Sequence, residues 1–180
     1  MSVLETARLI LRRPTPEDVP ALVALLGDFS VTKNLSRVPH PYTAEAGYAF
    51  VTLAGQNWTL RKDFPVVVIR RADNVLIGGG GVHPMDEFEM GYWLGRPYWA
   101  QGYATEAGRA LVRFAFEELG AERLNAGWFF DNPASARVLE KLGFVPDGED
   151  LRRCLSRGGE VLCHKVVLTR ADYHRRKDQR

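Results

Sequence analysis

The segment of residues 91–116, GYWLGRPYWAQGYATEAGRALVRFAF, constrains the fold of this chain more than any other stretch. It begins with an apolar run typical of a buried strand, breaks at Arg96-Pro97, crosses a turn rich in small residues, and continues with apolar residues at helical spacing. A strand, a short turn and a helix in this order form one unit of an α/β domain, in which the helix packs back onto the sheet.

The rest of the chain supplies further strands and helices of ordinary length. Thr15 and Thr43 are placed to cap helices, and Gly120 and Gly143 are placed to end them. We expect strands at residues 8–13, 64–71, 75–82, 87–95 and 123–129 and twice more near the C-terminus, and helices at 16–27, 44–58, 101–119 and 132–144. This order predicts an α/β (α+β) fold with a mixed, mostly antiparallel sheet.

The chain of 180 residues carries a formal net charge of +2 and is 46% hydrophobic, which suits one globular domain with a sizeable core. We therefore expect residues 1–180 to form a single domain, with its core at about 8–168 and a basic, solvated tail at 170–180. The small net charge argues against a nucleic-acid partner. There is no signal-peptide pattern and no membrane-spanning run, so no membrane association and a cytoplasmic location are expected.

Cys154 and Cys163 are nine residues apart, which matches no metal-ligand spacing, so no metal site is expected. If Gly158-Gly159 forms a two-residue hairpin turn, the two cysteines face each other across neighbouring strands. In a reducing compartment we expect both to remain thiols.

The turn before the helix at 101–119 is suited to bind an anion. Helix N-termini leave main-chain N–H groups unpaired and carry a partial positive charge. Ala100, Gly102 and Ala104 are small, so a phosphate group can approach the main chain, although tight packing of the helix on a strand would also explain small residues. No Lys-Ser/Thr pair follows the glycine, which argues against a Mg-nucleotide loop.

A second helix starts within DNPASARVLEKLGF, directly after the strand that we expect beside the first one. Asn132 is a natural N-cap, and Ser135 lies one turn inside on the same side. If the two strands are parallel but splayed, both helix starts face one crevice that suits an extended phosphorylated cofactor. The four glycines at 78–81 lack GxGxxG spacing and open no helix, so close packing or a bulge is expected there.

Together, GYWLGRPYWAQGYATEA and NPASARVLEKLGF resemble the acyl-CoA-binding core of the GNAT superfamily of N-acetyltransferases. The opening ETARLILRRPTPEDVPAL, the segment PHPYTAEA and IGGGGV are similar to its RimJ/RimL branch of ribosomal-protein-alanine N-acetyltransferases. The resemblance covers nearly the whole chain. It implies a single GNAT-like domain whose sheet is splayed at its centre, with helices on both faces, and acetyl-CoA as the cosubstrate.

The resemblance also implies the residues that bind the cofactor. The window WAQGYA places main-chain amides against the pyrophosphate, with Ala100 where the branch commonly has Gly. The splayed strand at 87–95 is expected to pair with the pantetheine amides and to polarise the thioester carbonyl. The implied residues are Tyr92, Trp93, Leu94, Trp99, Ala100, Gln101, Gly102, Tyr103, Ala104, Thr105, Asn132 and Arg137, of which Arg137 equally fits a solvated helix position.

The implied chemistry is direct attack of an amine on the thioester. Many members carry a general-acid Tyr in the second helix, but this chain has Leu139 there, and the resemblance gives the role to Ser135 or to a water. Glu89 is the candidate to receive the amine proton or to orient the ammonium, and an outward-facing strand carboxylate is the alternative. An α-amino group, with a pKa of about 8, does not demand a strong base.

Four further residues complete the candidates. By family likeness His40 borders the acceptor site, and Tyr42 fits the same border, although aromatic residues are more often core. His83 is expected to be a solvated turn histidine, and Glu106 is expected to face outward in the first helical turn.

The leading hypothesis is therefore transfer of an acetyl group from acetyl-CoA to a primary amine, either a protein N-terminal α-amine or a small-molecule amine. The alternative is a non-catalytic acyl-CoA-binding sensor or interaction module, which Leu139 keeps open. An RNA-associated role of the basic tail is a weaker third hypothesis. The sequence does not separate the acceptor classes, and it leaves the oligomeric state, including a homodimer, open.

Overall fold

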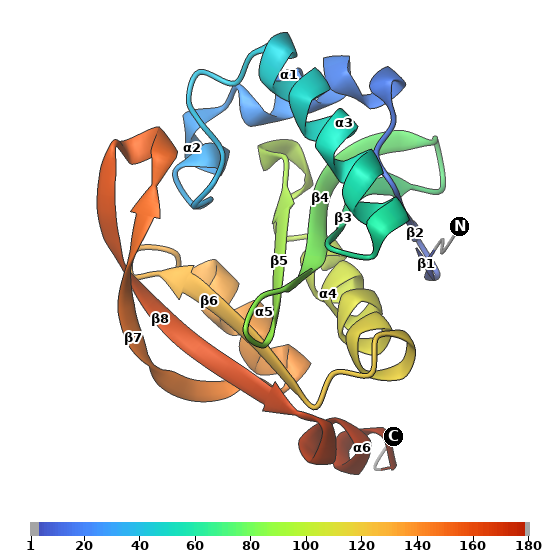
Figure 1. Cartoon of the computed structure of the whole chain (residues 1–180), viewed down its shortest axis with the longest axis vertical. Coiled ribbons are helices and arrows are strands. Elements are labelled where there is room, and N and C mark those ends of the chain that lie inside the picture. The colour runs from blue at the N-terminus through green and yellow to red at the C-terminus, as the bar shows by residue number, and fades with distance from the viewer. Residues whose placement is uncertain (1–3, 179–180) are drawn as a thin grey trace.

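Eight strands form one sheet in the order β1-β2-β3-β4-β5-β6-β8-β7 in the computed structural model, which describes residues 4–178 (Figure 1). The strands are β1 (Leu4–Glu5), β2 (Leu9–Arg12), β3 (Phe64–Arg70), β4 (Val75–Pro84), β5 (Phe88–Leu94), β6 (Arg123–Phe129), β7 (Val145–Cys154) and β8 (Gly159–Thr169). The helices are α1 (Val19–Leu26), α2 (Phe29–Thr32), α3 (Ala44–Leu60), α4 (Tyr103–Arg113), α5 (Pro133–Leu142) and α6 (Arg170–Asp178). The expected strands and helices are all present, with their ends shifted by a few residues.

The sheet divides at its centre. Neighbouring strands are antiparallel except β5 and β6, which run parallel and are paired only at Phe88 with Leu124 and at Glu89 with Asn125. Beyond these two pairs the strands separate, so the facing main-chain edges of Met90–Leu94 and of the second half of β6 have no strand partner. The expected mixed, mostly antiparallel sheet with a central splay is confirmed.

Helices cover both faces of the sheet, as expected. On one face, called the α3 face, Val67 and Ile69 pack beneath α1 and α3. On the other, called the α4 face, Val66 and Val68 pack beneath α4 and α5. This alternation along β3 follows from the two-residue period of a strand. Figure 1 shows α3 in front of the sheet and α5 behind it. No helix within residues 4–178 combines the length and apolar character that crossing a bilayer requires.

The run of four glycines lies in β4. Gly78 pairs with Val68, but Leu76 pairs with Ile69, so Ile77 is an extra residue and β4 carries a bulge there. A Cβ on Gly78 would be 2.2 Å from the Trp93 main-chain oxygen, so the backbones approach too closely for a side chain. Both expectations for this run, close packing and a bulge, are confirmed.

A strap joins the two halves of the sheet across the splay. We use this name for residues 32–36, which follow α2 and lie against the tip of the β7–β8 hairpin. Ser156 Oγ donates to Thr32 O at 2.9 Å, Arg157 Nε donates to Lys33 O at 2.7 Å, and Leu155 N donates to Ser36 O at 3.1 Å. The N-terminal segment and the C-terminal hairpin are therefore linked by hydrogen bonds to main-chain carbonyls.

The prediction that Cys154 and Cys163 face each other is wrong, whereas the expected free thiols are present. Residues 155–157 form a 3₁₀ turn, so that Cys154 pairs with Gly159 while Cys163 pairs with Asp150. The longer loop shifts the register, and the two cysteines are not opposite each other. Both are buried free thiols in one small apolar cluster with Phe129 and Val161.

The basic tail also differs from the expectation of a solvated terminus, because residues 170–178 form α6. The Tyr173 ring stacks on Phe116 with centroids 4.9 Å apart, and its hydroxyl donates to Glu117 at 2.6 Å. Lys177 donates to the same carboxylate at 2.7 Å. Tyr173, an aromatic side chain within a charged sequence, docks the helix against Phe116. The basic composition of the tail as a whole gives no sign of this contact.

Replacing Tyr173 tests this docking. Tyr173→Ala removes the stacked ring and the hydrogen bond to Glu117, and we expect it to lower the free energy of unfolding by about 2 kcal/mol. Urea denaturation followed by circular dichroism measures the change. The control is Arg175→Ala on the exposed side of α6, which is expected to stay within about 0.5 kcal/mol of the parent chain. Equal stability of both variants would contradict a docked α6.

Candidate active site

The N-terminus of α4 is open toward solvent and has no side-chain cap. Gly102 occupies the N-cap position with φ of 81°, a left-handed conformation that favours glycine. The first helical hydrogen bond runs from Glu106 N to Gly102 O at 3.1 Å, which leaves the N–H groups of Tyr103, Ala104 and Thr105 outside the helical ladder. These donors and the helix dipole suit an anion. The helix starts two residues later than its expected start at 101.

Ala100 adopts a left-handed conformation, although it is not glycine. Its φ is 58°, in the left-handed region where a Cβ costs about 1–2 kcal/mol. Trp99 before it is 41% exposed and donates its Nε1–H to Leu94 O at 2.7 Å, and Gln101 after it donates Nε2 to Pro97 O at 2.9 Å. The side chains of Trp99 and Gln101 thus brace the loop, and its main chain is left for a ligand.

Arg8 places a positive charge beside this loop. Its Nη1 donates to Gln101 O at 3.1 Å, and its guanidinium carbon lies 4.4 Å from the centre of the Tyr103 ring. An ideal Cβ on Gly102 would be 3.4 Å from Arg8 Nη2. Arg8 therefore lies where it can contact an anion held by the main chain. Sequence reasoning missed it, because no local pattern links residue 8 to a loop more than ninety residues later.

Glu106 holds Arg8 in place and does not face outward as predicted. Its carboxylate accepts from Thr6 Oγ1 at 2.6 Å, from Arg8 N at 2.9 Å and from Arg8 Nε at 2.7 Å, and its side chain is 17% exposed. Burial alone would raise the pKa of Glu106, but these hydrogen bonds and the charge of Arg8 outweigh it, and the pKa is lowered. The carboxylate ties α4 to the segment before β2.

The second helix start also behaves as the sequence suggests. Asn132 caps α5, and its side-chain oxygen accepts from Ser135 N at 3.3 Å. Ser135 Oγ lies 2.8 Å from the hydroxyl of Tyr92, which reaches across from β5. Burial raises the pKa of Tyr92 to about 12, although the Ser135 hydrogen bond acts to lower it. Leu139 is buried in the core at 2% exposure and cannot supply a proton.

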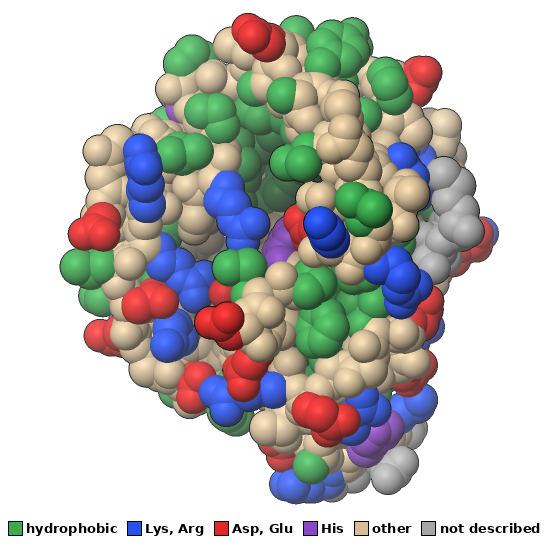
Figure 2. All heavy atoms as spheres, viewed as in Figure 1, with side chains coloured by type: hydrophobic (Ala, Val, Ile, Leu, Met, Phe, Trp, Pro, Cys, Tyr) green, Lys and Arg blue, Asp and Glu red, His purple; other side chains and the backbone are tan. Residues whose placement is uncertain are grey.

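A hollow lies over β5 on the α3 face. On this face three cross-strand pairs of β4 and β5 follow one another: Gly79 with Trp93, Gly81 with Gly91, and His83 with Glu89. A Cβ on Gly91 would meet nothing within 4 Å, so the middle pair leaves open space between an aromatic pair and a polar pair. We call this space the β5 hollow. Figure 2 shows a recess in this region, between α1 and α3 above and the β7–β8 hairpin at the left.

Glu89 and Arg152 close one side of the β5 hollow. Arg152 of β7 reaches over Gly127 of β6, where its guanidinium carbon is 3.8 Å from an ideal Cβ, and donates Nη1 to Glu89 at 2.7 Å. The side chains are 23% and 26% exposed. Burial lowers the pKa of Arg152, but the bond to Glu89 outweighs it and the net shift is upward. The two side chains therefore form an ion pair beside the hollow.

The remaining predicted residues lie apart from this arrangement. Tyr42 is 8% exposed, packs in the core beneath α1 and α3, and has its pKa raised by burial. His40 is exposed, and its ring lies edge-on to Phe29 at 5.2 Å. Arg137 is exposed on α5 and forms no ion pair with any described residue. The geometry assigns packing to Tyr42 and leaves His40 and Arg137 at the surface.

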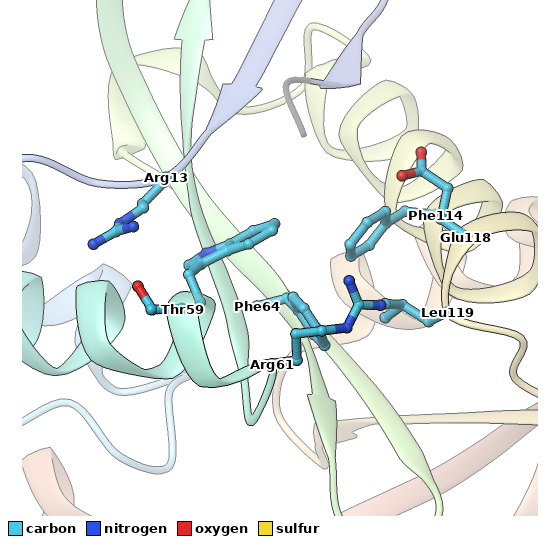
Figure 3. A pocket seen from close by; sticks show the side chains of 8 residues that line it. Arg13, Thr59, Arg61, Phe64, Phe114, Glu118 and Leu119 are labelled. Atoms are coloured by element: carbon cyan, nitrogen blue, oxygen red, sulfur yellow. The ribbon is translucent and has the colours of Figure 1, made fainter. Parts of the chain in front are cut away.

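A separate cavity of about 280 Å³ lies at the opposite end of α4 from Gly102. Trp58, Phe64 and Phe114 line it, and Figure 3 shows Arg61 extending across it toward Leu119. Because neither Gly102 nor the β5 hollow contributes to its lining, it is distinct from the anion site and from the gap between β5 and β6.

Comparison with known proteins identifies the family. Residues 8–145 match the model described as an acetyltransferase (GNAT) domain. The chain belongs to the GNAT family of acetyltransferases. The uncharacterized N-acetyltransferase YoaA of Bacillus subtilis is 31% identical over 150 residues, which cover 81% of this chain and 84% of YoaA. The GNAT-family acetyltransferase structure of Bacillus anthracis has a TM-score of 0.79 at 24% identity, covering 93% of this chain and 98% of that one.

RimL, a ribosomal L7/L12 alpha-N-protein acetyltransferase solved in complex with coenzyme A, shares the fold with a TM-score of 0.81 at 17% identity. The match covers 93% of this chain and 98% of RimL. Family membership makes the present chain a GNAT N-acetyltransferase, and enzymes of this family use acetyl-CoA. In this GNAT domain the open α4 N-terminus, the Tyr92–Ser135 pair and the β5 hollow all border the gap between β5 and β6.

The Glu106 anchor makes a pH-dependent prediction. Glu106→Gln keeps the shape but removes the charge that holds Arg8 and Thr6, and we expect it to destabilise the fold by about 1–2 kcal/mol at pH 7. The pKa of Glu106 is lower in the folded chain than in the unfolded chain, where it is about 4.3. The stability that its charge contributes is therefore complete above about pH 4.3 and is lost as the pH falls through the pKa of the folded state. The deficit should therefore shrink toward about pH 3.

Urea unfolding at pH 7 and at about pH 3 measures this difference. The matched control is Glu140→Gln, an exposed acid on α5 that forms no ion pair with any described residue and is expected to change stability by less than about 0.5 kcal/mol at either pH. A Glu106→Gln deficit that is the same at both pH values would show that the charge of Glu106 plays no part.

Proposed function

We propose that this GNAT enzyme transfers the acetyl group of acetyl-CoA to a primary amine that enters the β5 hollow from the α3 face. The observation that carries the proposal is the parting of β5 and β6 after Glu89 and Asn125. The open N-terminus of α4 lies on one side of this gap, and the open space at Gly91 lies on the other. A thioester threaded through the gap would face both a site for its leaving group and a site for its acceptor.

The α4 loop supplies the anchor for the cofactor. The uncapped main-chain N–H groups at the start of α4 and the guanidinium of Arg8 lie beside each other at Gly102, which suits the two charges of a pyrophosphate. Beyond Glu89 this edge of β5 has no strand partner, and although Leu94 O already accepts from Trp99, the main chain near Tyr92 can pair with the pantetheine amides as a neighbouring strand would. Asn132 keeps its side-chain NH₂ available while its oxygen caps α5.

The Tyr92–Ser135 pair suits protonation of the leaving thiolate. With a pKa of about 12, the Tyr92 hydroxyl keeps its proton at neutral pH and can donate to Ser135 Oγ at 2.8 Å. The amine nitrogen forms a bond to the thioester carbon and the carbon–sulfur bond breaks. Ser135 gives its proton to the sulfur, recovers one from Tyr92, and solvent restores the pair. The products are an N-acetylated amine and the free thiol of CoA.

The acceptor class is tested directly. We would measure CoA release from acetyl-CoA with peptides beginning with Ser or Ala, with spermidine and with kanamycin. RimL acts on a protein N-terminus by its description, which favours the peptides. Turnover of at least one amine supports the proposal. Tight acetyl-CoA binding without turnover of any amine would favour the non-catalytic sensor and overturn the proposal.

The anion site predicts a defined loss of binding. Gly102→Val fills the approach to the α4 N-terminus, and we expect acetyl-CoA to bind at least about 100-fold more weakly, because charge-assisted hydrogen bonds to the pyrophosphate are lost. Isothermal calorimetry measures the affinity. The control is Gly158→Val in the β7–β8 turn, where φ is also positive, at 70°, and where a Cβ meets nothing within 4 Å. Equal affinities of the two variants would place the pyrophosphate elsewhere.

The hydroxyl pair predicts a loss of rate rather than of binding. We expect Ser135→Ala to lower kcat about 100-fold, with Tyr92→Phe less severe, because Ser135 can still draw a proton from water. Steady-state kinetics with the best amine of the panel measure kcat, and calorimetry checks that acetyl-CoA still binds. Tyr48→Phe, on the exposed side of α3, is the control and should be unchanged. A Ser135→Ala variant with full kcat would exclude Ser135 as the proton donor.

A further inference from the structure

His83, expected from the sequence to be a solvated turn histidine, is instead fixed by a carboxylate at the polar end of the β5 hollow. Its Nδ1 lies 2.6 Å from Asp63 Oδ1, and the two side chains are 22% and 24% exposed. Asp63 also accepts the main-chain N–H of Phe64 at 2.9 Å, which orients the carboxylate. A carboxylate only accepts hydrogen bonds, so the neutral imidazole carries its proton on Nδ1. The other nitrogen, Nε2, is then an unprotonated base.

The direction of Nε2 follows from the order of the strands. β4 lies between β3 and β5, and Nδ1 is turned toward Asp63 on the β3 side. Cε1 of His83 lies 3.1 Å from the position of a Cβ on Gly81. Because the two ring nitrogens flank Cε1, Nε2 is turned away from Asp63 to the β5 side, where Gly91 leaves open space. No residue within the described chain makes a hydrogen bond to Nε2.

The charged groups around His83 show how its role differs from that of Glu89, the other candidate base. Asp63 faces it from the β3 side, Glu89 faces it from β5, and Lys62 is the exposed residue before Asp63. Glu89 is already paired with Arg152 at 2.7 Å, so its negative charge is partly compensated. His83 therefore presents the free basic atom, while Glu89 is suited to attract and orient an ammonium group.

We propose that His83 is the catalytic base of the acetyl transfer and that Asp63 is its positioning residue. This inference rests on the proposed function, because it requires an amine in the β5 hollow. Nε2 takes one proton from the bound ammonium group, which frees the nitrogen lone pair. The nitrogen attacks the thioester carbon, and as the carbon–sulfur bond breaks the nitrogen gives up a second proton to solvent. His83 then returns its proton to solvent, while the sulfur is protonated by the Tyr92–Ser135 pair.

The test is a pH profile of kcat/KM for the parent chain and for His83→Gln, with a hexapeptide beginning with Ser and, if turnover is higher, with spermidine. Without the base, the enzyme depends on amine that is already neutral, so its rate should rise about tenfold per pH unit up to the pKa of the amine, about 8 for a peptide. We expect the kcat/KM of His83→Gln to be about 100-fold below that of the parent chain near pH 6.5 and less than about fivefold below it at pH 9.

Two companion variants separate this role from a structural one. Asp63→Asn keeps an acceptor for Nδ1 but removes the charge that stabilises the imidazolium, and it should move the acidic limb of the profile to lower pH. His164→Gln breaks a similar histidine–carboxylate pair, 2.8 Å from Glu149, on the opposite face of the sheet, and should leave the profile unchanged. Calorimetry confirms that each variant still binds acetyl-CoA.

The outcomes are distinguishable. A His83→Gln profile that is unchanged, or lowered by the same factor at every pH, overturns the base assignment while the transferase function stands. The absence of turnover by the parent chain with any amine of the panel overturns both proposals.

Discussion

Two residue pairs between β5 and β6 are the constraint on which the rest of this structure depends. Had the strands continued to pair beyond Glu89 and Asn125, their main-chain groups would have satisfied one another and sealed the sheet. Because they separate, a buried sheet presents free main-chain edges at its centre, reachable from both faces. The α4 face brings the positive end of a helix to this opening, and the α3 face brings a space without side chains. An acyl carrier and its acceptor can therefore approach one bond from opposite sides.

Glycine shapes both approaches in different ways. At Gly102 the backbone needs a left-handed conformation, and the absence of a Cβ exposes the N–H groups of α4. At Gly91 the backbone is ordinary strand, and the missing side chain leaves open space between Trp93 and Glu89 of β5. The charged residues nearby are arranged by long-range pairs, Arg8 with Glu106 and Arg152 with Glu89. The main chain thus defines where the reactants lie, and paired charges define what is attracted there.

Local pattern predicted most of the fold and the open start of α4. Alternation and capping residues located the strands and helices, and the small residues around Gly102 marked the open helix end. Pairs that are distant in sequence could not be seen: Arg8 meets Glu106 across 98 residues, and Arg152 meets Glu89 across 63. The position of His83 opposite Glu89 could have been predicted, because both residues belong to the β4–β5 hairpin. The cysteine register failed because a 3₁₀ turn replaced the assumed two-residue turn.

The strap between residues 32–36 and the β7–β8 hairpin has a consequence for how the chain reaches this fold. The hydrogen bond between Ser36 and Leu155 closes a loop of the chain that contains β3 to β7. Contacts with such long sequence separation form only after the entropy of closing the loop has been overcome. The contacts that hold the two halves across the central opening are therefore expected to form late, after the β7–β8 hairpin is in place.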